Sequence, residues 1–181
     1  GTVIDPFAGG TTRGLVASIL GYHYIGTDLN KKQIEANEAK AKDLHEKNMT
    51  WHHDNGKNLR KYVKTAADML LTCPPYYDLE QYTDHQEDLS NAGTYEEFLK
   101  GYAEVLTPTY KLLAQGAYAI VVIGNVRDKN GNYQNLVGDT VTIMQQAGFN
   151  FYNEIILATS IATASLRARK TFDASKKVVK V

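Results

Sequence analysis

The stretch at residues 71–78, LTCPPYYD, combines three kinds of group that could take part in chemistry. Two adjacent prolines end an apolar run. Because proline lacks a backbone N–H, they form a rigid corner whose carbonyl oxygens can face a ligand. Tyr76 and Tyr77 each offer a flat aromatic face, and Cys73 is the only cysteine in the chain. The stretch therefore predicts either a binding corner made of carbonyl groups and an aromatic ring, or a reactive thiol.

Polar residues also follow three earlier apolar runs. The first run leads into Asp5-Pro6-Phe7-Ala8-Gly9-Gly10-Thr11, where glycines let backbone N–H groups approach a ligand closely. The second leads into Asp28-Leu29, where a carboxylate about 20 residues after the glycine turn suits the two hydroxyls of a ribose. The third leads into Asp54-Asn55, which could contact the edge of an adenine. Each signal alone also fits an ordinary turn, cap or loop, but together they favour one adenosine-bearing ligand.

These groups need a scaffold that brings the ends of several strands together. Apolar runs predict strands over residues 2–4, 22–26, 50–53, 68–72, 117–124 and 151–158. Helical periodicity predicts helices over 13–20, 30–47, 94–114 and 136–147, with a break near Thr107 because Pro108 follows. The run at 117–124 shows no alternation, which is typical of a strand covered on both faces. The alternating elements predict a doubly wound, mostly parallel α/β sheet with ligands at the carboxyl ends of its strands.

The composition limits the class of protein. A length of 181 residues with 43% hydrophobic residues is enough for one domain with a core. A single cysteine excludes an internal disulfide framework and a multi-cysteine zinc site, so we expect no metal and a reducing, cytoplasmic location. No apolar stretch reaches the length of a membrane span. The chain starts at Gly1 on a strand-like segment, so we expect residues 1–181 to be a single core from a longer protein.

Basic residues gather at the end of a chain that is neutral overall. There are 20 Lys and Arg against 20 Asp and Glu, yet residues 166–181 hold six basic residues and one acid, leaving 14 against 19 elsewhere. Such a segment could contact the phosphates of a nucleic acid, or could be the solvated face of a helix. The best candidates for phosphate contacts are Arg167, Arg169 and Lys170.

Two of these motifs resemble a known family. DPFAGGTT resembles the S-adenosylmethionine loop of amino-group DNA methyltransferases, usually D-P-F-x-G-x-G-T/S, and TCPPYYD resembles their catalytic motif [D/N/S]-P-P-[Y/F/W]. The stretches CPPYYDLE, VIGNVRDKNG, NLVGDT and RARKTFDASKK are similar to a branch of phage and prophage DNA methylases. The resemblance covers most of the chain and implies a class I, Rossmann-like methyltransferase that binds S-adenosyl-L-methionine. It implies that Asp5 to Thr11, Asp28-Leu29 and Asp54-Asn55 bind this cofactor.

The resemblance also implies the chemistry of the proline corner. It assigns methyl transfer to the exocyclic amino group of a flipped base to Thr72, Cys73, Pro74, Pro75 and Tyr76. A carbonyl group of the corner would accept a hydrogen bond from the amine, and Tyr76 would stack on the base. Cys73 stands where Asp, Asn or Ser is usual, so the acceptor is either a backbone carbonyl or the Thr72 hydroxyl. A covalent role for Cys73 is disfavoured, because cytosine C5 methyltransferases place their cysteine after the proline.

The expected acceptor is DNA. The T-C-P-P-Y form slightly favours N4 of cytosine over N6 of adenine. Related motifs serve enzymes that methylate RNA guanine or a protein glutamine amide, so an RNA or protein-amide methyltransferase is one alternative. A module that binds the cofactor without catalysis is the other. Residues 124–128 either line the target pocket or turn the chain.

Overall fold

The computed structural model describes residues 1–77, 81–128 and 130–157. The chain divides into two compact units, Gly1–Phe151 and Tyr152–Val181, and the fold described below is that of the first. In the second unit, the described residues 152–157 are exposed and carry no regular secondary structure. No helix in the described ranges combines the length and apolar character that a membrane crossing needs.

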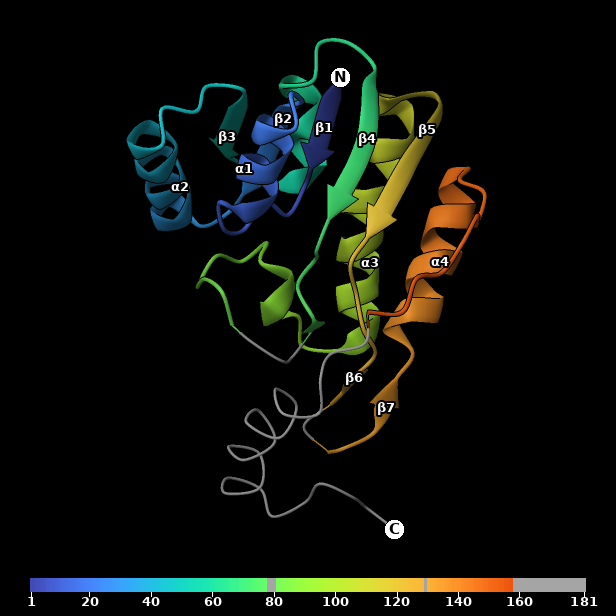
Figure 1. Cartoon of the computed structure of the whole chain (residues 1–181). Helices are drawn as coiled ribbons and strands as arrows, with labels where there is room; N and C mark the ends of the chain where they lie inside the picture. Colours follow the sequence, from blue (N-terminus) through green and yellow to red (C-terminus); the bar gives the residue numbers. More distant parts are fainter. Residues whose placement is uncertain (78–80, 129, 158–181) are drawn as a thin grey trace. The chain divides into compact units, whose positions relative to one another are not determined.

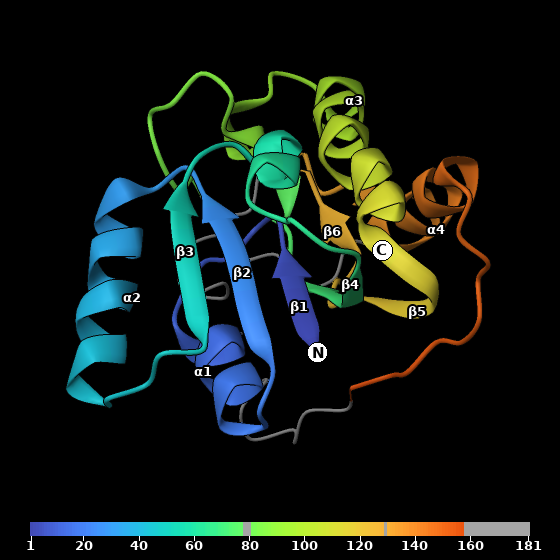
Figure 2. The same cartoon turned by 90° about the horizontal axis from the view of Figure 1, so that it is seen from above.

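Five parallel strands form the central sheet (Figures 1 and 2). They are β1 (Thr2–Asp5), β2 (His23–Asp28), β3 (Met49–His53), β4 (Ala67–Thr72) and β5 (Leu113–Val121), in the order β3-β2-β1-β4-β5. The strand order reverses at β1, which lies between β2 and β4. In an open α/β sheet, ligands bind at such a reversal, outside the carboxyl ends of the strands. The sheet thus has the ligand-binding edge that the sequence predicts.

Helices cover both faces of this sheet (Figure 2). The α-helices are α1 (Thr12–Ile19), α2 (Lys31–Asp43), α3 (Tyr95–Leu106) and α4 (Leu136–Ala147), and the 3₁₀ helices are η1 (Gly56–Lys61), η3 (Leu89–Asn91) and η4 (Thr107–Leu112). A short antiparallel hairpin joins β6 (Val126–Arg127) to β7 (Tyr133–Gln134). The α3 helix begins with a capping box, in which the Thr94 side chain accepts from Glu97 N–H and the Glu97 side chain accepts from Thr94 N–H.

Two hydrophobic clusters show that both faces of the sheet are buried. Val3 and Tyr24 pack in one cluster with α1 and α2, whereas their neighbours Ile4 and Ile25 pack in the other with α3 and α4. Successive strand residues point to opposite faces, so this split confirms the predicted doubly wound architecture.

The structure differs from the prediction in four places. The helix predicted over 30–47 already ends at Asp43. The helix predicted over 94–114 breaks after Leu106, next to Pro108, as predicted. Beyond the break, residues 107–112 form the 3₁₀ helix η4, and β5 already begins at Leu113. The prediction that residues 117–124 are covered on both faces is wrong. Tyr118, Ile120 and Val122 are 54, 44 and 45% exposed, because no described helix covers their side of β5. The predicted strand at 151–158 is also wrong over the described residues 151–157, since strand formation requires a hydrogen-bonded neighbour that apolar composition does not supply.

Candidate functional site at the carboxyl end of the sheet

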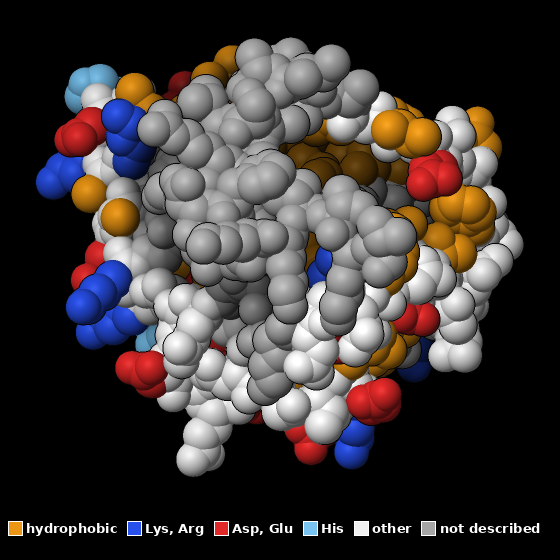
Figure 3. All heavy atoms as spheres, turned by 90° about the horizontal axis from the view of Figure 1, so that it is seen from below, with side chains coloured by type: hydrophobic (Ala, Val, Ile, Leu, Met, Phe, Trp, Pro, Cys, Tyr) orange, Lys and Arg blue, Asp and Glu red, His pale blue; other side chains and the backbone are white. Residues whose placement is uncertain are grey.

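A cavity of about 280 Å³ opens where the strands end. Its wall combines residues that follow β1, β2, β3 and β4 with residues of the 81–93 loop. Figure 3, which views the molecule from the side toward which the strands point, shows exposed apolar side chains on this face. Eleven sequence-predicted site residues line the cavity: Pro6, Phe7, Gly9, Gly10, Asp28, Leu29, Asn55, Cys73, Pro74, Pro75 and Tyr76. The glycine turn and the proline corner therefore share one cavity.

Asp28 lies in the cavity wall, where its carboxylate already holds two backbone groups. Gly9 N–H donates to Oδ2 and Asn30 N–H donates to Oδ1, each at 2.8 Å. Burial raises the pKa of the Asp28 carboxyl, although these two hydrogen bonds oppose the shift. Each carboxylate oxygen retains a lone pair, so Asp28 can accept further hydrogen bonds from a pair of ligand hydroxyls.

The glycine turn is held from outside the cavity. Arg13 donates through Nη2 to the carbonyl oxygens of Phe7 (2.6 Å) and Ala8 (2.9 Å). From α2, Asn37 donates to Gly9 O at 2.7 Å. Gly9 itself has a φ of +51°, which glycine adopts without strain. These contacts fix the turn with its main chain toward the cavity.

Two residues of the predicted cofactor turn do not face the cavity. Ala8 is fully buried, and its N–H donates to Thr27 O at 2.9 Å. The Thr11 hydroxyl donates to Asn37 Oδ1 at 3.0 Å. Both residues therefore shape the turn and do not line the cavity.

Asp5 and Thr72 also lie behind the wall. Neither has measurable exposure, and the Thr72 hydroxyl donates to Asp5 Oδ1 at 2.6 Å. The other donors to Asp5 are Phe7 N–H (3.0 Å), Arg13 Nε (2.6 Å) and the Tyr24 hydroxyl (2.8 Å). Of the two acceptors expected for the substrate amine, this geometry favours the backbone carbonyl, because the Thr72 hydroxyl is bound inside the core. The Asp5 carboxylate is likewise bonded inside the core, so its position does not support a direct contact with the cofactor.

At the end of β3, Asn55 reaches the cavity and Asp54 does not. Burial alone would raise the pKa of Asp54, but hydrogen bonds from Asn58, Tyr62 and Lys61 lower it to about 2. These partners hold the Asp54 carboxylate against η1. The predicted contact of Asp54 with an adenine edge is therefore not supported by its position. Asn55 lines the cavity, and its Oδ1 caps η1 by accepting from Lys57 N–H at 3.0 Å.

The proline corner turns its two tyrosines in opposite directions. Tyr76 lines the cavity, whereas Tyr77 is 9% exposed and packs edge-on against Tyr95, with ring centroids 5.4 Å apart. Tyr77 has a φ of +50°, an unusual value for a tyrosine, and its side chain packs in the hydrophobic core directly after Tyr76. Burial raises the pKa of Tyr76 to about 12, and the adjacent Cys73, which hydrogen-bonds its side chain, adds to the shift. At neutral pH Tyr76 therefore presents a neutral ring.

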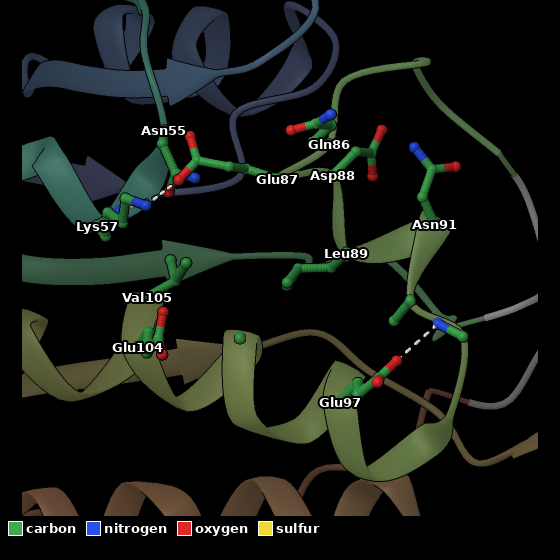
Figure 4. A pocket seen from close by; sticks show the side chains of 13 residues that line it. Asn55, Lys57, Gln86, Glu87, Asp88, Leu89, Asn91, Glu97, Glu104 and Val105 are labelled. Carbon is green, nitrogen blue, oxygen red and sulfur yellow. Dashed lines mark hydrogen bonds and ion pairs between the residues drawn. The ribbon is translucent and has the colours of Figure 1, made fainter.

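The 81–93 loop, which the sequence analysis left unassigned, forms the opposite wall. Asp88 organises it: Oδ2 accepts from Thr83 N–H at 2.8 Å and Oδ1 accepts from Ser90 N–H at 3.0 Å. Glu87 pairs with Lys57 of η1, which lowers the pKa of Glu87. This pair lies beside a second cavity of about 330 Å³, bounded by η1, α3 and the loop (Figure 4). The loop is therefore fixed beside Asn55 and η1, where it closes one side of the first cavity.

The region after β5 forms the β6–β7 hairpin near the corner. A Cβ on Gly124 would lie 3.8 Å from the Tyr76 ring, so the chain passes this ring as it leaves the sheet. Asn125 donates to the Tyr133 hydroxyl at 2.7 Å and accepts from Val137 N–H at 2.9 Å. Residues 124–128 thus turn the chain and do not line the cavity.

Arg167, Arg169 and Lys170 fall outside the described residues. In the described part of the chain, no group of three or more His, Cys, Asp or Glu side chains could hold a metal ion.

Comparison with known proteins gives matches at the level of structure. No family model and no curated protein matches the sequence. A candidate rRNA methylase from Clostridium thermocellum has a TM-score of 0.58 and 17% identity, over 89% of this chain and 78% of that one. An rRNA methylase from Streptococcus thermophilus has a TM-score of 0.55 and 15% identity, over 88% and 82%. The chain has the Rossmann-like fold of class I methyltransferases.

A third structure with this methyltransferase fold is NSun6 from Pyrococcus horikoshii, solved with SFG. Its TM-score is 0.59 at 18% identity, over 88% of this chain and 40% of NSun6. At such identities the similarity concerns the methyltransferase fold.

Proposed function

We propose that this protein transfers a methyl group from S-adenosyl-L-methionine to an exocyclic amino group of a nucleic-acid base. DNA is the proposed acceptor, with N4 of cytosine favoured over N6 of adenine by the T-C-P-P-Y form of the corner. The observation that carries the proposal is the shared cavity, which joins the glycine turn and Asp28 to the corner ending in Tyr76. The residues proposed to bind the cofactor and the residues proposed to bind the target base line the same cavity.

The residues of the cavity fit the proposed cofactor. The two carboxylate oxygens of Asp28 suit a ribose diol, and the Asn55 side chain suits the edge of an adenine. A Cβ built on Gly10 would meet no atom within 4 Å, so the turn leaves open space for a ligand. The volume of about 280 Å³ is near the lower end of the range for small-molecule sites. When bound, the cofactor would supply a methyl group on a positively charged sulfur; transfer to the amine would leave S-adenosylhomocysteine, and the amine would lose one proton to solvent.

The corner performs two tasks in this proposal. Pro74 and Pro75 fix the backbone, so that a carbonyl oxygen of Cys73 or Pro74 can accept a hydrogen bond from the amine of the base. This interaction returns electron density to a nitrogen whose lone pair is delocalised into the ring. Tyr76 provides a stacking surface, which contributes about 1–3 kcal/mol per base in comparable contacts. Cys73 lies beside the neutral Tyr76 phenol and precedes both prolines, whereas the cysteine of cytosine C5 methyltransferases follows the proline, so it receives no covalent role.

The test uses the full-length protein with isotopically labelled S-adenosyl-L-methionine and DNA from a methylation-deficient host. Nucleosides from the digested DNA are then analysed by mass spectrometry. The proposal expects labelled N4-methylcytosine, or N6-methyladenine as the less favoured product. Labelled C5-methylcytosine would overturn the non-covalent chemistry.

RNA is the second candidate acceptor, because two of the structural neighbours are rRNA methylases by description. A parallel reaction with unmodified total RNA separates the candidates. Labelled RNA with unlabelled DNA would replace DNA by RNA as the acceptor. Cofactor binding without transfer to DNA, RNA or protein would identify a binding module and overturn the proposed enzyme.

A further inference from the structure

The cofactor turn and the proline corner follow neighbouring strands whose backbone pairing stops short of both. The paired residues of β1 and β4 are Val3 with Met69 and Ile4 with Leu70. Asp5 and Thr72 come after these pairs, at the last position of each strand. On the other side of β4, pairing with β5 extends to Thr72, and Val122 N–H donates to Thr72 O at 2.8 Å. The corner is therefore held to β5 by the backbone, while toward β1 its connection is a side-chain hydrogen bond.

This hydrogen bond joins Thr72 Oγ1 to Asp5 Oδ1 at 2.6 Å. Both residues are fully buried, so the bond is shielded from water, and a carboxylate acceptor makes it charge-assisted. The same carboxylate accepts from Arg13 Nε at 2.6 Å, and the Arg13 guanidinium also binds the carbonyl oxygens of the glycine turn. Asp5 thus connects Arg13, which holds the glycine turn, to Thr72, which precedes Cys73 and the two prolines of the corner.

We infer that Thr72 and Asp5 are positioning residues that fix the distance between the cofactor turn and the proline corner. The inference rests on the proposed methyl transfer and adds a role that neither residue would have as a direct ligand. In-line transfer requires the amine and the methyl group to be aligned, and a misplacement of about 1 Å can reduce a catalytic rate about 100-fold. Loss of the Thr72–Asp5 bond should therefore affect the transfer step more than cofactor binding.

The main variant is Thr72→Val, which keeps the shape of the side chain and removes the donor. Asp5 Oδ1 still accepts from Phe7 N–H in this variant, so the carboxylate is not left without a partner. We expect kcat for methyl transfer to labelled DNA to fall about 10- to 100-fold. The Kd for S-adenosylhomocysteine, measured by calorimetry, should stay within about threefold. Thr72→Ser restores the hydroxyl and should recover most of kcat.

The matched control is Tyr24→Phe. It removes another buried hydrogen bond to the same carboxylate, from the Tyr24 hydroxyl at 2.8 Å, without altering β4. Its midpoint of thermal unfolding should fall at least as far as that of Thr72→Val, whereas its loss of kcat should be much smaller. If Thr72→Val does not fold, Thr72→Ala, which introduces no new group, takes its place.

Cys73 gives a readout that does not depend on turnover. It is the only cysteine of the chain, it follows Thr72 directly and it lines the cavity. Release of the corner from Asp5 should raise the rate of Cys73 alkylation by iodoacetamide several-fold in Thr72→Val, but not in Tyr24→Phe. If the unaltered protein methylates nothing, the proposed function fails while alkylation still tests the positioning role.

Three results would overturn the inference. One is an unchanged alkylation rate in a folded Thr72→Val protein. Another is a kcat equal to that of the unaltered protein. The third is a Thr72→Val protein whose cofactor affinity and kcat fall together in proportion to a loss of folded protein, which is the signature of a purely structural role.

Discussion

Asp28 offers the sharpest test of how the cavity binds its cofactor. Asp28→Ala removes the acceptor for two ligand hydroxyls and also for Gly9 N–H and Asn30 N–H. A hydrogen bond to a charged group contributes about 1.5–3 kcal/mol. At the lower value, two lost ligand contacts amount to about 3 kcal/mol, which corresponds to an affinity loss of about 100-fold. At the same lower value, the two lost backbone contacts should lower the free energy of unfolding by about 3 kcal/mol.

The assay is calorimetric titration with S-adenosylhomocysteine, accompanied by chemical denaturation. Asp54→Ala is the matched control, because it removes a carboxylate that follows the next strand of the sheet but contacts η1. This control should lose stability and keep its ligand Kd within about threefold. Equal affinity losses in the two variants would refute the assignment of Asp28 to the ribose and Asp54 to the scaffold.

The pH dependence of binding gives the same test a second measurement. Ligand hydroxyls donate to the ionised carboxylate, so affinity should be full at neutral pH and fall as the pH drops through the pKa of Asp28. Because burial raises this pKa, the loss should begin at a higher pH than for an exposed aspartate, whose pKa is about 3.9. The acid limb should be absent in Asp28→Ala. If affinity for S-adenosylhomocysteine still falls at low pH in Asp28→Ala, the titration belongs to another group.

The other predictions concern the corner, the turn and the basic segment. Tyr76→Ala should lower kcat/KM about 5- to 150-fold through lost stacking, and Tyr76→Phe should retain most activity in the same methylation assay. Cys73→Ser should keep methyl transfer; a variant that binds S-adenosylhomocysteine but is inactive would contradict the non-covalent role. Gly56→Ala should lower the free energy of unfolding by about 1–3 kcal/mol, because the new Cβ would lie 2.5 Å from Pro6 O and 2.7 Å from a Val105 methyl. Gly10→Ala should leave stability nearly unchanged and weaken cofactor binding, so equal unfolding curves for the two glycine variants would contradict the geometry. Neutralising the basic segment should reduce the salt dependence of DNA binding by up to about 2.7 in the slope of log K against log salt, while cofactor affinity stays constant. The residues to change together are Arg167, Arg169 and Lys170.

The sequence predicted best those features that depend on position along one strand. The glycine turn, Asp28 and the proline corner were found because parallel strands bring their carboxyl ends to one edge. The doubly wound sheet followed from alternating apolar runs and helical patterns. These signals are local, so a single sequence contains them.

The features that the sequence did not predict depend on contacts between distant segments. In the sequence, Arg13 is indistinguishable from other helix residues. In the fold, its guanidinium binds Asp5 and two carbonyl oxygens of the turn. The choice between Asp54 and Asn55 depends on where each side chain points after β3, which η1 decides through its bonds to Asp54. Thr72 has a residue type suited to catalysis, but its position inside the core determines its role. An arginine three residues after a glycine pair was the one available hint, and it has no specific interpretation without the fold.

The 67-residue separation of Asp5 and Thr72 affects how the site forms during synthesis. At about 5–20 residues per second, roughly 3–13 s pass on the ribosome between the two residues. During this interval β1 lacks β4, its neighbour in the centre of the sheet, and the apolar edge of β1 stays open to unintended strand pairing. A ribosome that stalls before β4 would therefore leave a nascent chain whose glycine turn is translated while β1 has no β4 beside it and the cavity lacks the proline corner.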